Sequence, residues 1–233
     1  MRVLALDTTR DAGSVAVIEN DRVLVELAGD TALSCAARLP GDVLRALNAA
    51  TMRISDIDLF AVAAGPGPFT ALRIGIATVQ GLAFVNGKRV VPVSTLEATA
   101  YGALRSTGAG MIGVWLDAHR GEVYSALYRR GGDQRLIELE APAVATAEAT
   151  WLRWSGREER PALLAGDGAV LYRDVAGRVE IDPPSRLAPL VGQLALLRAE
   201  AGAAVDPAGV QPLYVRRPDA EIARDARSGG RRG

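Results

Sequence analysis

Two aspartates end short apolar runs in the two halves of the chain. Asp7 follows the run VLAL, and Asp117 follows the run IGVWL. A carboxylate at such a place can bind magnesium or face a nucleotide phosphate, or it can accept N–H hydrogen bonds from its own turn. Glycine lets a backbone approach a phosphate closely, and each turn has a single glycine, Gly13 or Gly121. We therefore predict that each aspartate binds its own turn, which leaves both as weak candidates for cofactor binding.

The stretch GPGPFTALRIGIATVQGLAF, residues 65–84, joins a Gly-Pro turn to a long apolar segment, as a phosphate-binding loop would. A P-loop follows its last glycine with Lys and then Ser or Thr, because the ammonium must reach the terminal phosphates. The chain's only lysine, Lys88, comes after the expected helix. We predict that the turn directs the helix instead, since proline restricts φ and glycine permits a tight bend. The turn residues are Gly65, Pro66, Gly67 and Pro68.

The sequence contains no evident set of catalytic or metal-binding residues. One cysteine, Cys35, excludes an intrachain disulfide, and one histidine, His119, excludes a zinc site built on a histidine pair. Residues 33–52, where the first long helix is expected, contain no histidine, so this helix cannot place two imidazoles one turn apart to hold a metal ion. We predict no catalytic residue and no metal site. An active actin-like ATPase or kinase stays as an alternative, and a metallopeptidase-like enzyme as a weaker one.

The composition indicates a globular protein without a charge-driven partner. Of its 233 residues 49% are hydrophobic, and 27 basic and 27 acidic residues give a formal net charge of zero. Such a chain has no overall field to draw it onto nucleic acid or an anionic membrane. Its apolar runs are shorter than the roughly 18 residues of a membrane span, and an early aspartate interrupts any signal-peptide core. We expect a cytoplasmic protein that does not bind membranes.

Hydrophobic periodicity predicts the same order of elements twice. In the first half we expect three strands, then helix, strand, helix, strand and helix, at residues 2–6, 14–19, 22–28, 33–52, 58–65, 70–86, 90–93 and 95–106. The second half repeats this order, ending with a helix over 187–201. Two βββαβαβα halves describe the duplicated actin/Hsp70-like, ribonuclease H-like α/β architecture. We predict domains at 1–107 and 108–216, and a charged tail at 217–233 that is expected to be disordered.

Four segments, in this order, resemble the TsaB family, also called YeaZ: LALDTTRDAGSVAV, GPGPFTALRIGIATVQGLA, LDAHRGEVY and PLYVRRP. They cover nearly the whole chain, and the second is the most specific because it is long and unusual in composition. The chain departs from the family at Ser34 and Cys35, where a histidine is common, and at His119, where an arginine is usual. These departures argue only against assigning chemistry to those positions.

The resemblance implies an actin-like fold and a role in a tRNA-modifying complex. The family supplies a non-catalytic dimerization subunit that pairs with the catalytic subunit TsaD. With the ATPase subunit TsaE, the pair supports transfer of a threonylcarbamoyl group to N6 of adenosine 37 in ANN-decoding tRNAs. The resemblance also implies that the chain contacts tRNA only through the complex and binds no cofactor alone. A homodimer is the alternative to pairing with TsaD. ATP and a metal are expected in the partner subunits.

Small residues give the helix after the Gly-Pro turn one smooth face. Helical spacing groups Ala71, Gly75 and Thr78, so another helix could approach closely. That neighbour could belong to the same domain or to a partner; the residues leave both open, and the resemblance favours a partner. The predicted interface combines this helix with the preceding one, through Leu39, Val43, Leu47, Ala71, Gly75 and Thr78.

Overall fold

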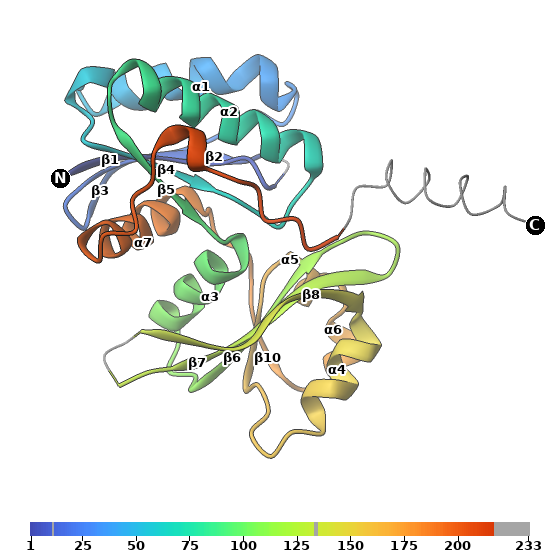
Figure 1. The fold of residues 1–233 in the computed structure, drawn as a ribbon. Coiled ribbons are helices and arrows are strands. Elements are labelled where there is room, and N and C mark those ends of the chain that lie inside the picture. The colour runs from blue at the N-terminus through green and yellow to red at the C-terminus, as the bar shows by residue number, and fades with distance from the viewer. Residues whose placement is uncertain (11, 133–134, 217–233) are drawn as a thin grey trace, which may run out of the picture.

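Two five-stranded mixed sheets form the framework of the protein, one from each half of the chain (Figure 1). The computed structural model describes residues 1–10, 12–132 and 135–216, so the predicted tail at 217–233 lies outside the described residues. The first sheet has the order β3 (Arg22–Ala28), β2 (Ser14–Glu19), β1 (Arg2–Asp7), β4 (Leu59–Ala63) and β5 (Arg89–Val93). The second has the order β8 (Leu136–Thr146), β7 (Glu122–Arg130), β6 (Met111–Asp117), β9 (Leu163–Ala165) and β10 (Glu180–Asp182).

Both sheets use the same pairing. The first three strands of each half form antiparallel hairpins, and the last two strands add in parallel. Asn20 and Asp21 form the turn between β2 and β3, and Asn20 has a φ of 56°. Every residue of β4 is buried, as expected for a central strand that is covered on both faces. The predicted element order is thus confirmed in both halves.

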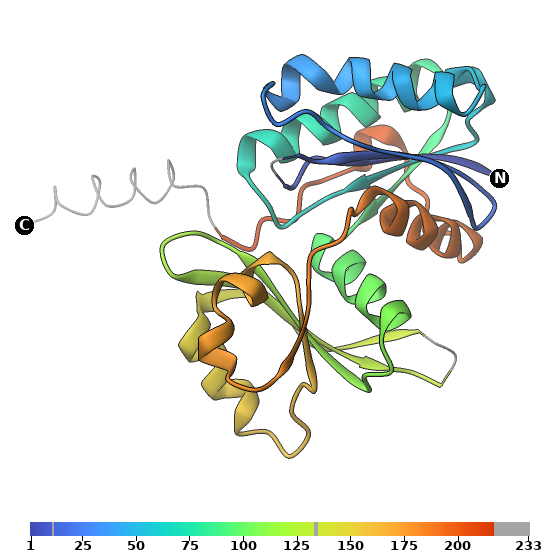
Figure 2. The same cartoon turned by 180° about the vertical axis from the view of Figure 1, so that it is seen from behind.

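Helices cover both faces of each sheet (Figures 1 and 2). Over the first sheet, α1 (Cys35–Ala49) and α2 (Phe69–Val85) lie side by side on one face, and α7 (Ala188–Glu200) covers the other. The second sheet lies between α3 (Thr95–Ser106) on one face and α4 (Ala147–Ser155), α5 (Asp167–Leu171) and α6 (Arg173–Ala176) on the other. Two short 3-10 helices are η1 (Ile54–Asp56) and η2 (Pro207–Gly209). Among the described residues, no helix has the length and apolar character needed to cross a membrane.

The last helix of each half packs on the sheet of the other half. Helix α3 contributes Leu96 and Leu104 to the core beside β6, whereas α7 contributes Val191 to the core of the first sheet. The backbone N–H of Ala188 donates to the buried Ser14 hydroxyl at 3.0 Å, which ties the start of α7 to β2. The two lobes therefore exchange their final helices, and the domain division at 107/108 stays a prediction.

The chain after α7 returns along the β5 edge of the first sheet and then passes the start of α2 (Figure 1). Val205 pairs with Val90 beside the first sheet, and the N–H of Leu213 donates to the carbonyl of Ala64 at 2.7 Å. Gln80 of α2 holds this return segment by donating to the carbonyl of Pro207 at 2.9 Å. Residues 213–216 consequently lie against the start of α2.

Candidate functional site

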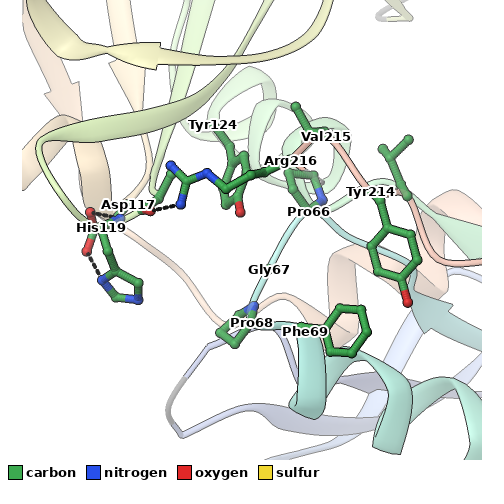
Figure 3. A pocket seen from close by; sticks show the side chains of 12 residues that line it. Pro66, Gly67, Pro68, Phe69, Asp117, His119, Tyr124, Tyr214, Val215 and Arg216 are labelled. Atoms are coloured by element: carbon green, nitrogen blue, oxygen red, sulfur yellow. Dashed lines mark hydrogen bonds and ion pairs between the residues drawn. The ribbon is translucent and has the colours of Figure 1, made fainter. Parts of the chain in front are cut away.

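The two lobes meet at a hollow that is lined by the ends of strands from both sheets and by residues 213–216 (Figure 3). It consists of two adjoining cavities of about 190 Å³ and 140 Å³. Pockets that bind small molecules usually measure about 300–1,000 Å³, so the two cavities together reach only the lower end of this range. The residues that line both cavities are Pro66, Gly67, Pro68, Asp117, His119 and Tyr124.

Asp7 is buried at the end of β1 and is bound by its own turn. Its Oδ1 accepts hydrogen bonds from the N–H of Thr9 at 2.8 Å and from the Thr9 hydroxyl at 2.6 Å. Only 2% of Asp7 is exposed, and this burial raises the pKa of its carboxyl above the ordinary value, against the opposing effect of the Thr9 hydrogen bonds. The turn-binding role predicted for Asp7 is confirmed.

Asp117 occupies the corresponding place in the second lobe and lines the hollow. Its Oδ1 accepts from the N–H of His119 at 2.9 Å and from the Tyr172 hydroxyl at 3.5 Å, and its Oδ2 lies 3.1 Å from His119 Nδ1. The His119 side chain is 78% exposed on a residue with a φ of 58°. Asp117 therefore also binds its own turn, as predicted, and Figure 3 shows the histidine and the carboxylate at one edge of the hollow.

The Gly-Pro stretch forms the turn between β4 and α2. Gly65 has a φ of 109°, a conformation that favours glycine, and its carbonyl accepts the N–H of Thr95 at 2.8 Å. Gly67 packs against Thr9, and a Cβ at Gly67 would lie only 3.1 Å from Thr9 Cγ2. The turn is thus packed between β1 and the start of α3. Lys88 lies beyond the other end of α2, so it cannot serve this turn as a P-loop lysine.

Four residues of the predicted partner interface lie inside the chain's own core. Leu39, Val43 and Leu47 are at most 4% exposed, and Gly75 is buried against Thr8. A partner could not reach these four residues without opening the core, so we correct the predicted contacts. The other two, Ala71 and Thr78, are half-buried. A partner interface on α1 and α2 stays a prediction, and it must use the outward residues of these helices.

The sequence interpretation missed a buried ion pair on α1. Arg38 Nη1 lies 2.7 Å from Asp42 Oδ2, with side-chain exposures of 2% and 0%, and Arg45 Nη2 lies 2.5 Å from Asp42 Oδ1. Gly13 and Gly29 leave the space that the Arg38 guanidinium occupies. An Arg and an Asp four residues apart on a helix are neighbours, so this spacing could have revealed the pair.

A second missed feature is a stack of two aromatic rings at the mouth of the hollow. Phe69 and Tyr214 have ring centroids 5.3 Å apart and an interplanar angle of 23°. The guanidinium carbon of Arg73 lies 4.1 Å from the centre of the Phe69 ring. Because the two rings are far apart in the sequence, no local pattern could predict that they meet.

Comparison with known proteins identifies the family. The tRNA threonylcarbamoyladenosine biosynthesis protein TsaB of Bacillus subtilis (strain 168) is 31% identical over 226 residues, which cover 95% of this chain and 96% of that protein. This chain belongs to the TsaB family. The TsaB protein of Escherichia coli (strain K12) is 32% identical over 191 residues, which cover 73% of this chain and 81% of that protein. The family model for TsaD, tRNA N6-adenosine threonylcarbamoyltransferase, matches residues 34–168.

Solved structures agree with this membership of the TsaB family. YeaZ from Pseudomonas aeruginosa superposes with a TM-score of 0.78 at 30% identity, covering 91% of this chain and 99% of that one. The predicted family and the duplicated actin-like α/β fold are therefore confirmed. The family belongs to the biosynthesis of threonylcarbamoyladenosine in tRNA.

In the part of the chain that the structure describes, no three His, Cys, Asp or Glu side chains gather as metal ligands would.

Proposed function

We propose that this chain is a non-catalytic pairing subunit. It binds the catalytic subunit TsaD, and together with TsaE the pair supports N6-threonylcarbamoylation of adenosine 37 in tRNA. Family membership supports the process, and the match of the TsaD model over residues 34–168 supports pairing through similar surfaces. The observation that carries the proposal is the apolar outer face of α1 and α2.

This outer face consists of Leu44 on α1 and Ala77, Gly81, Phe84 and Val85 on α2, all exposed. Phe84 and Val85 are 78% and 82% exposed, although apolar side chains of this size usually gain from burial. Spacings of four and three residues put Ala77, Gly81 and Phe84 in one row. A Cβ on Gly81 would meet nothing within 4 Å, so the row leaves room for another helix. Apolar surface of this kind typically marks a protein interface.

The hollow between the lobes supports a role without catalysis. The two carboxylates that could have held magnesium or phosphate, Asp7 and Asp117, are engaged by their own turns. We therefore assign ATP and the metal ion to the partner subunits. A homodimer would use the same outer face and would compete with TsaD for it.

Analytical ultracentrifugation of the purified chain with purified TsaD tests this proposal. We expect Phe84→Arg to weaken pairing by about 30-fold or more, because truncating or charging a central contact typically costs at least about 2 kcal/mol. Leu152→Arg is the matched control, since Leu152 is 76% exposed on α4 of the other lobe. Both variants should melt like the unmodified chain.

Pairing of Phe84→Arg at the unmodified affinity would overturn the proposed face. A separate calorimetric titration with ATP tests the alternative activity. Micromolar binding of ATP by the chain alone would favour an actin-like ATPase or kinase instead.

A further inference from the structure

The stack at the mouth of the hollow is a compact exposed platform, defined by Phe69, Arg73 and Tyr214. Phe69 and Tyr214 are 39% and 40% exposed, and neither ring belongs to a hydrophobic core cluster of the described residues. Arg73 lies over Phe69 and donates from Nε to the Tyr214 hydroxyl at 2.8 Å. These contacts hold both rings in nearly parallel planes at the surface, as Figure 3 shows for the two rings.

The positive charge of the platform is not neutralised within it. Arg73 is bound by a neutral phenol, and no carboxylate of the described residues forms an ion pair with it. The first turn of α2, on which Phe69 stands, also contains no acidic residue. A phosphate approaching Arg73 would therefore meet no carboxylate in that turn.

The next arginine along the hollow, Arg216, is already paired with a carboxylate. It lies 5.7 Å from the centre of the Tyr124 ring, donates to the carbonyl of Ala118 at 2.7 Å and forms an ion pair with Glu122. The positive charge that the platform offers to a phosphate is therefore that of Arg73.

We propose that this platform binds RNA directly, by stacking an unpaired base on its rings while Arg73 contacts the adjacent phosphate. Proteins that recognise single-stranded RNA stack unpaired bases on aromatic side chains and on arginine planes. The inference rests on the proposed function, because that function makes tRNA the available RNA. It differs from the sequence-based expectation, in which tRNA is reached only through the complex.

RNA fits this platform better than a second protein does. The platform combines an unpaired cation with two accessible rings, whereas the apolar outer face of the proposed TsaD contact centres on Phe84. Phe69 and Phe84 are fifteen residues apart on α2, or about 22 Å at 1.5 Å per residue. Arg73 of the platform and Ala77 of the outer face are only about one helical turn apart, so the two surfaces adjoin. Each platform variant is therefore measured for pairing with TsaD as well as for tRNA binding.

The test measures fluorescence anisotropy of a labelled, unmodified transcript of an ANN-decoding tRNA. It is titrated with the isolated chain and with the chain assembled with TsaD. We expect Tyr214→Ala and Phe69→Ala to weaken tRNA binding by about five-fold or more, the low end of the effect of one base–ring stack. Tyr214→Phe, which keeps the ring, should bind like the unmodified chain. Arg73→Ala should lower the slope of log affinity against log salt by about one.

The matched control is Tyr101→Ala with Arg105→Ala, which removes another surface cation–π pair, with Arg105 Cζ 5.6 Å from the Tyr101 ring centre. It should leave tRNA affinity unchanged. The proposal would be overturned if Phe69→Ala, Arg73→Ala and Tyr214→Ala all bound tRNA with unaltered affinity. It would also be overturned if the unmodified chain bound no tRNA, either alone or assembled with TsaD.

Two further outcomes would replace RNA by another ligand. If the platform variants lost assembly with TsaD while the isolated variants kept their tRNA affinity, the platform would be a protein contact. Displacement of tRNA by micromolar AMP would identify a free nucleotide as the ligand. Sedimentation measures pairing with TsaD separately, so a failure of the proposed function would appear as lost pairing. The tRNA affinity of the isolated chain would still test the platform.

Discussion

Gly75 of α2 lies directly against Thr8 at the end of β1. A Cβ on Gly75 would come within 3.0 Å of Thr8 Cγ2, and the Thr8 hydroxyl donates to the carbonyl of Ala71 at 2.8 Å. At Gly75 the backbone of α2 therefore packs directly on the Thr8 side chain, with no side chain of α2 between them. Gly81, two turns further along the same helix, has no atom within 4 Å of the corresponding position.

These two glycines predict opposite effects of the same substitution. Gly75→Leu should lower the free energy of unfolding by about 1–3 kcal/mol or more, because an overpacked contact must push Thr8 and β1 away. Gly81→Leu should be neutral or should raise it by up to about 1 kcal/mol, since glycine is unfavourable inside a helix. Urea unfolding of the isolated variants measures both. Equal stability of the two variants would show that α2 does not pack on Thr8 in this way.

The Arg38–Asp42 pair should behave as a buried ion pair. Asp42→Ala leaves the Arg38 guanidinium buried without its carboxylate, and we expect a loss of about 3–5 kcal/mol in the free energy of unfolding. Arg38→Met combined with Asp42→Leu should cost less than Asp42→Ala alone, because it removes both charges and keeps most of the volume. The exposed pair of Arg186 and Glu26 supplies the control, and Glu26→Ala should cost less than about 1 kcal/mol.

Unfolding in guanidinium chloride measures the free energy of unfolding of these three variants. If the double variant were less stable than Asp42→Ala, the pair would not behave as a buried ion pair that apolar side chains can replace.

Asp7 should make stability depend on pH in a definite direction. Burial raises the pKa of its carboxyl in the folded state, so the folded chain holds this proton more tightly than the unfolded chain. The contribution of Asp7 to stability then falls as pH rises from the ordinary aspartate pKa, about 3.9, through the raised value. Asp7→Asn keeps an acceptor oxygen for Thr9 and does not titrate. The stability of Asp7→Asn relative to the unmodified chain should therefore increase with pH across this window.

Urea unfolding of both proteins at a series of pH values, starting near the ordinary aspartate pKa, tests this dependence. Titrations elsewhere in the chain cancel in the difference. A difference that stays flat or decreases with rising pH would contradict the raised pKa of Asp7.

Local patterns were enough to predict the two sheets, and not enough to orient their helices. The run ending at Asp7 and the run ending at Asp117 each predicted a strand, a turn and a return strand, because alternation and turn chemistry act over a few residues. Helix α2 carries apolar or small residues on most sides, so spacing could not tell that Gly75 faces Thr8 and Gly81 faces outward. The meeting of Phe69 with Tyr214 depends on the return of the chain after α7, which is a long-range property.

Reconstituted tRNA modification tests the central claim most directly. Incorporation of the threonylcarbamoyl group into an unmodified ANN-decoding tRNA is measured by mass spectrometry with TsaD, TsaE, ATP, an activated threonylcarbamoyl donor and increasing amounts of this chain. The account predicts no incorporation by the chain alone, and incorporation that rises with the fraction of TsaD bound to it. Phe84→Arg should shift this dependence to about 30-fold higher concentration without lowering the final rate. Incorporation by the chain alone, or full incorporation with Phe84→Arg when no complex forms, would contradict a non-catalytic pairing subunit.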